Sequence, residues 1–493
     1  MFHVIVLIVL VACAGMSSVQ ATEPNPPNWP SSVRVFDPSD NDIESTVNAA
    51  FKVNGGHNPA NNGQFSKERY AFLFKPGTYA VDVPVGYYTS VYGLGDSPND
   101  VVFSGDKGVY AEEGDYNFQG GALCTFWRSA ENFRTTSAHN WQVGTGMIWA
   151  VSQASPLRRI VVDNDLSLFE YQPPAYAAGY SSGGFIANSE IKGDLKFGSQ
   201  QQFMVRNVNL GQKIDTPPVW NGVFVGCAGE IPESHCGSKG TSQHPIVTAA
   251  KTPSIAEKPF ISFESEKYFL NVPKLRIDST GNSFDDEVNP IDFSKVYVTN
   301  VNDDAATINS KLAQGLHIVI SPGIYYLDTS LQVTYSNQVL LGLGMATLVT
   351  TSHEPCITVG DRLDGVRNTH THTLPLSLKT YTPKLQVRIA GLLLEAKVSQ
   401  TSSLLLWGSS TYKGDSTNPG ILSDVFARNG VFTDETVSSS VDTMVSIYSG
   451  NVIIDNTWLW RADHDSKGVV DQSENPTKHG LYVHGDDVIA YGQ

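Results

Sequence analysis

The feature that most constrains the fold of this chain is one pattern that occurs twice. Residues 72–95 read FLFKPGTYAVDVPVGYYTSVYGLG, and residues 318–344 read IVISPGIYYLDTSLQVTYSNQVLLGLG. The two Pro-Gly turns lie 246 residues apart and the two Gly-Leu-Gly triplets lie 249 residues apart. Because the copies keep the same order with an insertion of only three residues, the sequence predicts a tandem repeat of a unit of roughly 250 residues.

A short helix is predicted before each copy of the pattern. Residues 41–52 (NDIESTVNAAFK) and 303–314 (DDAATINSKLAQ) both begin with Asp or Asn. Both then place apolar residues at helical spacing: Ile43, Val47 and Phe51 in the first, and Ala305, Ile308 and Leu312 in the second. We expect each helix to cover the open end of the unit that follows and to block pairing at its edge.

Each copy continues as a series of short β-like segments that recur about every 20–25 residues, a spacing typical of solenoids. Segments such as VRNVNL and VIIDNTWLW alternate apolar and polar residues, so one face of each strand points inward. Asn188, Asn207 and Asn456 end segments where a left-handed turn is expected. The sequence therefore predicts an all-β protein with two tandem right-handed parallel β-helices, each with an N-terminal capping helix. A sandwich or propeller would not explain these helices.

These patterns divide the chain into four parts. Residues 1–21 contain a short apolar run and a Val-Gln-Ala sequence typical of a cleaved secretory signal, so we expect a secreted, extracellular protein. The first β-helix is predicted over 30–255, a linker over 256–293, and the second β-helix over 294–493. Because the sequence stops within a predicted rung and terminal repeats need a polar cap, we expect the second β-helix to be incomplete at its C-terminal end.

Charge and cysteine content restrict the partners. The chain has 33 Lys and Arg against 49 Asp and Glu, for a formal charge of −16. Such a surface repels nucleic acid and anionic lipid, so we expect neither nucleic acid nor, after signal cleavage, a membrane as partner. Cys227 and Cys236 are close enough in sequence to form a disulfide in an oxidising compartment. No zinc-type spacing is present, and we expect no metal, no cofactor and a monomer.

Three segments carry a resemblance to a known family. GSQQQFMVRNVNL (198–210), FWRSAENF (126–133) and WLWRADHD (458–465), together with the doubled pattern, resemble the pectate-lyase-like superfamily. Within it, the architecture resembles glycoside hydrolase family 55, the exo-β-1,3-glucanases. The resemblance implies pectin-lyase-like solenoids and inverting hydrolysis of a neutral polysaccharide, β-1,3-glucan, from a chain end. It also implies a reacting water held by glutamine, which matches Gln201 and Gln202.

Only one of these two glutamines can face a cleft, because neighbouring strand residues point to opposite faces. An Asn or Gln ladder inside the solenoid is the structural alternative for both. The proton donor is expected late in the second β-helix or, if the chain is incomplete, beyond it, in which case the protein is inactive. Asp463 is the candidate carboxyl within the chain.

The segment around Asp463 supplies the candidate sugar-binding residues. Trp458 and Trp460 offer aromatic faces on which a pyranose ring stacks, and Arg461 and His464 offer hydrogen-bond donors. The alternative is that both tryptophans are core residues and that the polar residues form a turn.

Three other functions stay open at this point. Asp486 and Asp487 resemble the paired aspartates of polygalacturonases, although a turn before the next strand explains them better. A calcium-dependent polysaccharide lyase would bind calcium at a wall of acidic residues and use Arg158 or Arg159 as base. The alternatives are surface positions for both arginines and solvated turn carboxylates for the acidic residues. The candidate acidic residues are Asp163, Asp165, Glu170, Glu190 and Asp194. A non-catalytic glycan-binding or cell-wall protein is the third.

Overall fold

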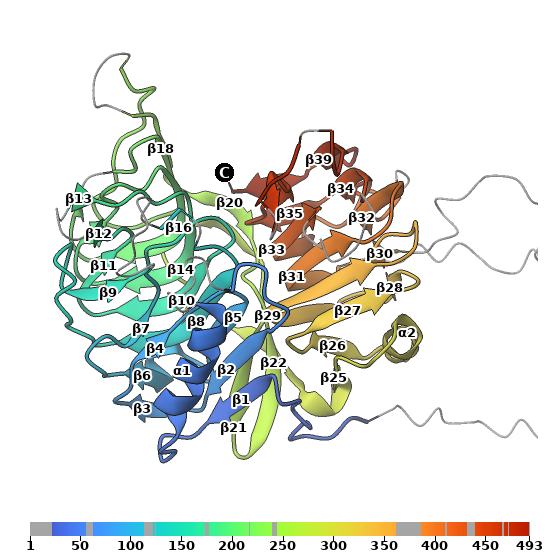
Figure 1. Cartoon of the computed structure of the whole chain (residues 1–493), viewed down its shortest axis with the longest axis horizontal. Helices are drawn as coiled ribbons and strands as arrows, with labels where there is room; N and C mark the ends of the chain where they lie inside the picture. The colour runs from blue at the N-terminus through green and yellow to red at the C-terminus, as the bar shows by residue number, and fades with distance from the viewer. Residues whose placement is uncertain are drawn as a thin grey trace, which may run out of the picture.

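The computed structural model describes residues 22–55, 63–112, 122–123, 125–172, 177–215, 217–238, 244–360, 386–409, 412–430, 439–465, 468–471 and 473–492. The predicted signal at 1–21 lies outside these residues. The described chain forms two side-by-side stacks of parallel strands, called here the N-terminal stack and the C-terminal stack (Figure 1). No helix in this described part is long and apolar enough to cross a membrane.

The N-terminal stack is built on one long parallel sheet. Its order is β1 (Val33–Phe36), β2 (Tyr70–Phe74), β5 (Thr89–Gly93), β8 (Arg128–Thr135), β10 (Leu157–Val162), β14 (Phe185–Ile191), β16 (Gln202–Leu210), β18 (Asn221–Val225) and β19 (Ile246–Ala249), joined by β3 (Gly77–Tyr79) and β6 (Val101–Phe103). Smaller sheets contain β9 (Gly146–Ile148), β11 (Asp165–Ser167), β15 (Leu195–Lys196) and β17 (Ile214–Asp215), then β4 (Val83–Pro84) with β7 (Val109–Tyr110), and β12 (Tyr171–Gln172) with β13 (Ala177–Ala178).

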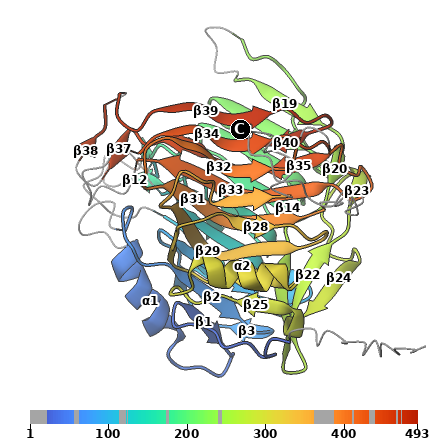
Figure 2. The same ribbon diagram turned by 90° about the vertical axis from the view of Figure 1, so that its right-hand side faces the viewer.

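The C-terminal stack repeats this arrangement, with strands lying one above another from β25 to β39 (Figure 2). Its main sheet contains β25 (Val296–Val298), β26 (His317–Ile320), β29 (Val339–Thr350), β31 (Arg388–Ala396), β33 (Gly420–Asn429), β35 (Val452–Asp455) and β40 (Ile489–Tyr491), joined by β27 (Ile324–Leu327) and β36 (Leu459–Arg461). Its second sheet contains β28 (Leu331–Val333), β30 (Ile357–Val359), β32 (Thr401–Trp407), β34 (Val441–Ile447) and β39 (Thr477–Val483), and β37 (His464–Asp465) pairs with β38 (Gly468–Val469).

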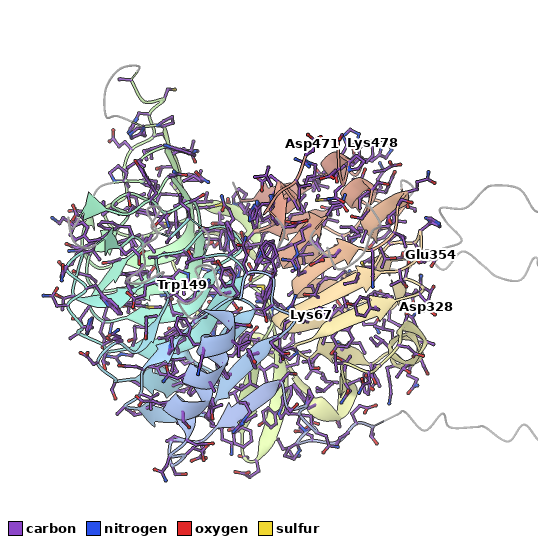
Figure 3. All side chains as sticks on the ribbon, viewed as in Figure 1. Lys67, Trp149, Asp328, Glu354, Asp471 and Lys478 are labelled. Carbon is purple, nitrogen blue, oxygen red and sulfur yellow. The ribbon has the colours of Figure 1, made fainter. Side chains whose placement is uncertain are left out.

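Apolar ladders along the stacking direction hold each stack together. Leu157 pairs with Ile186, Ile186 with Val205, and Val205 with Phe224. All four side chains are fully buried, and burying each one stabilises the fold by about 1.5–3 kcal/mol. Trp149 fills the interior of the same stack (Figure 3). A single strand buries little by itself, so these ladders form only when the strands are stacked.

The two predicted helices are present: α1 (Ile43–Asn54) and α2 (Ala305–Ala313). Their buried residues belong to the cores of the N-terminal and C-terminal stacks respectively. In the repeated pattern, the Tyr79 hydroxyl donates to the carbonyls of Phe36 and Lys75. The Tyr325 hydroxyl likewise bonds Ser321 and Thr299. The pattern thus serves folding, with its tyrosine tying the turn to the strand before it.

The connection between the stacks, predicted as a linker over 256–293, is folded. It contains β20 (Thr252–Ile255) paired with β23 (Arg276–Ser279), and an antiparallel sheet of β21 (Phe260–Glu264), β22 (Lys267–Pro273) and β24 (Val288–Asp292). The 3-10 turns are η1 (Pro98–Asp100) and η2 (Phe293–Lys295). Ile261 and Leu270 of this sheet pack with residues of both stacks, and Figure 1 shows β21 and β22 between the stacks. The connection is therefore part of the core between the stacks.

The predicted disulfide is wrong. Cys227 and Cys236 are both free. The Cys227 thiol lies in the core of the N-terminal stack, where it donates to the carbonyl of Val205, whereas Cys236 is exposed. Burial raises the pKa of the Cys227 thiol to about 11, so this sulfur is a core atom rather than a reactive thiol.

Candidate functional site

The candidate site lies where the two stacks meet beside β14, β16 and the end of β35. A cavity of about 40 Å³ is lined by Gln153, Ala154, Ser155, Gly184, Phe185 and Met204 from the N-terminal stack, and by Asn456, Thr457, Trp458 and Gly492 from the C-terminal stack. This volume accommodates a water molecule but no sugar ring. None of the side chains that line it carries a carboxyl group.

Three polar side chains of the N-terminal stack converge next to this cavity. Gln153 donates from Nε2 to the Ser182 hydroxyl at 3.1 Å. A Cβ atom placed on Gly183 would lie 3.3 Å from Cγ of Gln153 and 3.4 Å from Nε2 of Gln202, so both glutamine side chains lie against this glycine. Gln153, Ser182 and Gln202 are half-buried. Gln153 lines the cavity and can hydrogen-bond to a water there, with Ser182 and Gln202 beside it.

The structure distinguishes three consecutive glutamines. Gln200 points into the N-terminal stack, where its amide bonds the carbonyls of Val151 and Leu168 and the N–H of Gly183. The buried glutamine of the run is therefore Gln200, which was not among the candidates, while Gln202 lies beside Gln153. Gln201 makes main-chain hydrogen bonds, accepting from the N–H groups of Trp220 and Asn221.

A row of aromatic rings continues from the cavity toward solvent. Trp458 stacks on Trp127 at 4.7 Å between ring centroids and on Trp460 at 5.3 Å, and lies 5.1 Å from Phe126. Trp127 is buried, while Trp458 and Trp460 are half-buried. The two predicted tryptophans therefore pack against the other stack and keep part of their surfaces accessible, which suits stacking against a sugar.

The polar residues after Trp460 form two separate groups. His464 Nδ1 lies 2.6 Å from Asp463 Oδ1, and its Nε2 lies 2.6 Å from Nε2 of Gln64. The His464 ring is 5.2 Å from that of Trp460, and the side chain of Asp463 is 69% exposed. Arg461 instead donates to the carbonyls of Asp471 and Glu474. The structure thus places Asp463 and His464 beside the aromatic row, whereas Arg461 stabilises the loop that contains Asp471 and Glu474.

A buried ion network lies directly beneath the cavity. Arg158 forms two hydrogen bonds of 2.7 Å with Asp424 and one of 2.7 Å with Asp455. Asn456, which lines the cavity, donates to Asp424 at 2.7 Å. Burial opposes ionisation of Asp424, but the charges of Arg158 and Lys258 outweigh it and lower its pKa to about 2. This network fixes the position of the cavity wall that the C-terminal stack supplies.

Several of the side chains proposed for other chemistries are engaged elsewhere. Asp163 binds Arg134 and Lys192, and Asp165 binds Lys196. Within the described ranges, no group of three or more His, Cys, Asp or Glu residues could hold a metal ion. Asp486 pairs with Lys413 at 2.6 Å, and Asp487 has a φ of 55° in the turn before β40. These observations agree with the turn interpretation of both aspartates.

Sequence reasoning missed several residues of this site: Gln153, Ser182, Phe126, Trp127, Asn456 and Thr457. A spacing pattern could have found two of them. Gln153, Ser182 and Gln202 follow each other at intervals of 29 and 20 residues, close to the 29 and 19 that separate the ladder residues Leu157, Ile186 and Val205. Polar residues at the rung interval are expected to stack at one place on the solenoid.

Comparison with known proteins gives consistent matches. The model of the LAM55 pectate lyase-like domain matches residues 296–371 and 369–493. An exo-β-1,3-glucanase from Streptomyces sp. (strain SirexAA-E / ActE) is 36% identical over 465 residues, which cover 93% of this chain and 68% of that protein. The solved structure of sacteLam55A from Streptomyces sp. SirexAA-E is 33% identical, with a TM-score of 0.79 over 96% of this chain and 76% of that one. An ensemble refinement of a sacteLam55A variant in complex with glucose has a TM-score of 0.80 over the same shares.

Proposed function

The chain belongs to the LAM55 pectate-lyase-like family that includes the Streptomyces exo-β-1,3-glucanase, and on this premise we propose that it is a glycoside hydrolase that cleaves β-1,3-glucan. The observation that carries the proposal is the meeting of a water-sized polar cavity with an aromatic row at the junction of the stacks. Such a junction provides the two things that glycoside hydrolysis needs, a positioned water and a surface for the sugar.

The water is assigned to the cavity beside Gln153, Ser182 and Gln202. Amide and hydroxyl groups are both donors and acceptors, so they can orient a water. As the oxygen of this water bonds to the anomeric carbon, its proton passes to solvent, because no carboxylate lines the cavity. Inverting glycosidases attack with water from the face of the sugar opposite the departing oxygen. The site therefore supports inversion, with the sugar lying between the cavity and the proton donor.

The sugar is assigned to the row formed by Trp458 and Trp460. Asp463 is the candidate proton donor, because its carboxyl lies beside His464, whose ring contacts Trp460. Protonation of the leaving oxygen by a carboxylic acid is the other half of the reaction. In this arrangement His464 is a positioning residue, which holds Asp463 through a 2.6 Å hydrogen bond.

The arrangement of the strands supports the rest of the proposal. We interpret each stack as a right-handed parallel β-helix and the two stacks as a tandem repeat, because a helix, a Pro-Gly turn and stacked strands follow in the same order in each. The net charge of −16 favours a neutral glucan over an acidic polysaccharide. The sequence at 1–21 supports secretion, and we propose that the protein acts as a monomer.

Incubation of the purified chain with laminarin tests the proposal. The expected result is release of glucose, with the α-anomer appearing first in the NMR spectrum because inversion converts a β-linkage to an α-product. A Trp458→Ala variant should raise KM, since the stacking surface for the sugar is lost.

Three results would contradict the assignment. Folded protein that releases no sugar but retains laminarin would favour the glycan-binding alternative. An unsaturated product formed from polygalacturonate with Ca²⁺ would favour the lyase. The β-anomer appearing first would contradict inversion.

A further inference from the structure

A second and larger cavity, of about 520 Å³, lies between the connection and the C-terminal stack. It opens beside β22 and β24 and the beginnings of β26, β29 and β31. Its apolar side includes Val272 and Ile291, and its polar side includes His317, Asn337, Gln386 and Arg388. Pockets of 300–1,000 Å³ with an apolar wall and a few polar groups are typical of small-molecule sites. It shares no lining residue with the cavity beside Trp458.

Arg388 is a buried cation without a counter-charge among the described residues. Its side chain is 5% exposed, its Nη1 donates to the Pro419 carbonyl, and its Nη2 donates to Asn418 Oδ1 at 3.1 Å. Its Nε is buried and has no hydrogen-bond partner. Burial alone lowers the pKa of Arg388 to about 10, so the guanidinium is still charged at neutral pH. Buried charges are ordinarily paired.

The two buried arginines of the ion network show the contrast. Arg158 pairs with Asp424 and Asp455, and Arg206 pairs with Glu257 and Asp455. Both therefore have carboxylates at 2.7–2.9 Å. Arg69 and Arg159 are also buried without a carboxylate partner among the described residues. Of these three arginines, only Arg388 combines a buried Nε without a hydrogen-bond partner with a place in the lining of the cavity of about 520 Å³.

The neighbouring polar groups add donors beside Arg388. The Val339 N–H donates to His317 Nδ1 at 3.1 Å, which leaves the ring proton on Nε2. Burial and the charge of Lys295 lower the pKa of His317 to about 4, so the ring is neutral at pH 7. Asn418 donates to Asn337 Oδ1 at 2.9 Å, and Gln386 donates to Asp415 at 3.0 Å. The cavity thus offers two cations, Arg388 and Lys274, and several neutral polar groups. The Lys274 ammonium pairs with Glu287, so of the two cations only Arg388 has no carboxylate partner among the described residues.

We propose that this cavity binds a sugar that carries a carboxylate, with the carboxylate facing Arg388. A guanidinium matches the planar geometry of a carboxylate with two parallel hydrogen bonds, and a single cation without a carboxylate partner suits a monoanion better than a doubly charged phosphate. The amides of Asn337 and Gln386 suit the sugar hydroxyls, and Val272 and Ile291 suit the apolar face of the ring. The assignment is independent of the proposed glucanase site, since the two cavities are separate.

Calorimetric titration of the full chain tests this assignment with three probes: D-glucuronate, D-glucose and inorganic phosphate. D-Glucuronate should bind and raise the melting temperature, and the other two should do neither, because only the first combines a carboxylate with a hydroxylated ring. Asn337→Asp places a negative charge on the cavity wall and still accepts the hydrogen bond from Asn418. It also suits the φ of 62° at this position, which Asp tolerates as Asn does. This variant should weaken D-glucuronate binding at least tenfold.

Asn48→Asp in α1 is the matched control, because it makes the same change in net charge outside the cavity, and it should bind D-glucuronate as the unaltered chain does. Neither variant should change glucose release from laminarin, so failure here is distinguishable from failure of the glucanase proposal. Any of four results would overturn the assignment: D-glucose binding equal to that of D-glucuronate, phosphate binding as tight as that of D-glucuronate, no binding by any probe, or an equal loss of D-glucuronate binding in both variants.

Discussion

At the scale of the residue, the side chain of Gln202 is expected to contribute to catalysis and that of Gln201 is not. Replacing Gln202 with Ala removes one group that orients the water, and we expect kcat/KM on laminarin to fall about 10²-fold or more. Gln201→Ala deletes the same atoms at the adjacent position and serves as the matched control, with activity expected near that of the unaltered enzyme. Equal losses in the two variants, or no loss in Gln202→Ala, would remove Gln202 from the site.

The glutamine run also shows how far sequence alone reaches at this scale. The resemblance to glycoside hydrolase family 55 implied that a glutamine at the start of β16 holds the water. Alternation leaves the choice between neighbouring glutamines open until the strand is placed in the stack. Gln153 and Ser182 were missed because they belong to other rungs than Gln202, and only the stacking of the rungs brings Gln153 and Gln202 to Ser182 and Gly183. The prediction of a disulfide between Cys227 and Cys236 was wrong for a related reason. Spacing along the chain does not reveal that the Cys227 thiol points into the core.

At the scale of the element, neighbouring strands of the main sheets share one aligned position at which the backbone adopts the left-handed conformation. Asn132 in β8, Arg159 in β10, Asn188 in β14 and Asn207 in β16 have φ values of 49–58°, and pairing of the flanking residues aligns all four. In the C-terminal stack, Gly391, Asp424 and Asn456 continue this feature with φ values of 51–69°.

The left-handed conformations of Asn188, Asn207 and Asn456, expected from the sequence, are confirmed. The first two, however, lie inside strands rather than at their ends. Asparagine is favoured here because it tolerates the left-handed region and can bind nearby main chain. Periodicity could not reveal this interior position, because a single left-handed residue bends a strand without ending its pairing.

Asn207 gives a test of the left-handed position. Its side chain donates to the carbonyl of Gly281 at 3.1 Å and accepts from the Thr252 hydroxyl at 2.7 Å. Asn207→Gly loses these bonds but fits φ of 52°, whereas Asn207→Ala also incurs the steric cost of that dihedral. Urea unfolding should show both variants destabilised, with Ala lower than Gly by about 1–2 kcal/mol. Equal stability of the two variants would show that the backbone conformation contributes nothing.

At the scale of the whole molecule, the two stacks and the connection are joined by buried charges. Arg158 and Arg206 come from the N-terminal stack, Glu257 and Lys258 from the connection, and Asp424 and Asp455 from the C-terminal stack. The surface alternative for Arg158 and Arg159 was wrong for both, since Arg158 is 3% exposed and Arg159 is 8% exposed. The sequence could not predict these pairs, because their partners lie up to 297 residues apart and the relative position of the stacks decides them.

The network makes the stability of the whole molecule depend on pH through Asp424. Its pKa is about 2 in the folded protein against an ordinary value of 3.8. A carboxyl group whose pKa is lowered by folding contributes its full stabilisation when the pH is above the pKa of the unfolded state. This stabilisation is lost as the pH falls from about 4 through about 2. The shift corresponds to a contribution on the order of 2 kcal/mol. Asp424→Asn should destabilise the protein at pH 6 by about 3–5 kcal/mol, because it leaves Arg158 and Lys258 short of a negative charge.

Urea unfolding at pH 6 and at pH 3 measures both effects in the same samples. The unaltered chain should lose stability between the two pH values, and Asp424→Asn should lose less, because the group that titrates has been removed. Asp486→Asn is the matched control: its partner Lys413 and its own side chain are exposed, so water screens the pair and stability should change little. If Asp424→Asn and the unaltered chain lost equal stability on acidification, Asp424 would not be the origin of the pH dependence, and the carboxylates of Asp455 and Glu257 in the same network would be tested next.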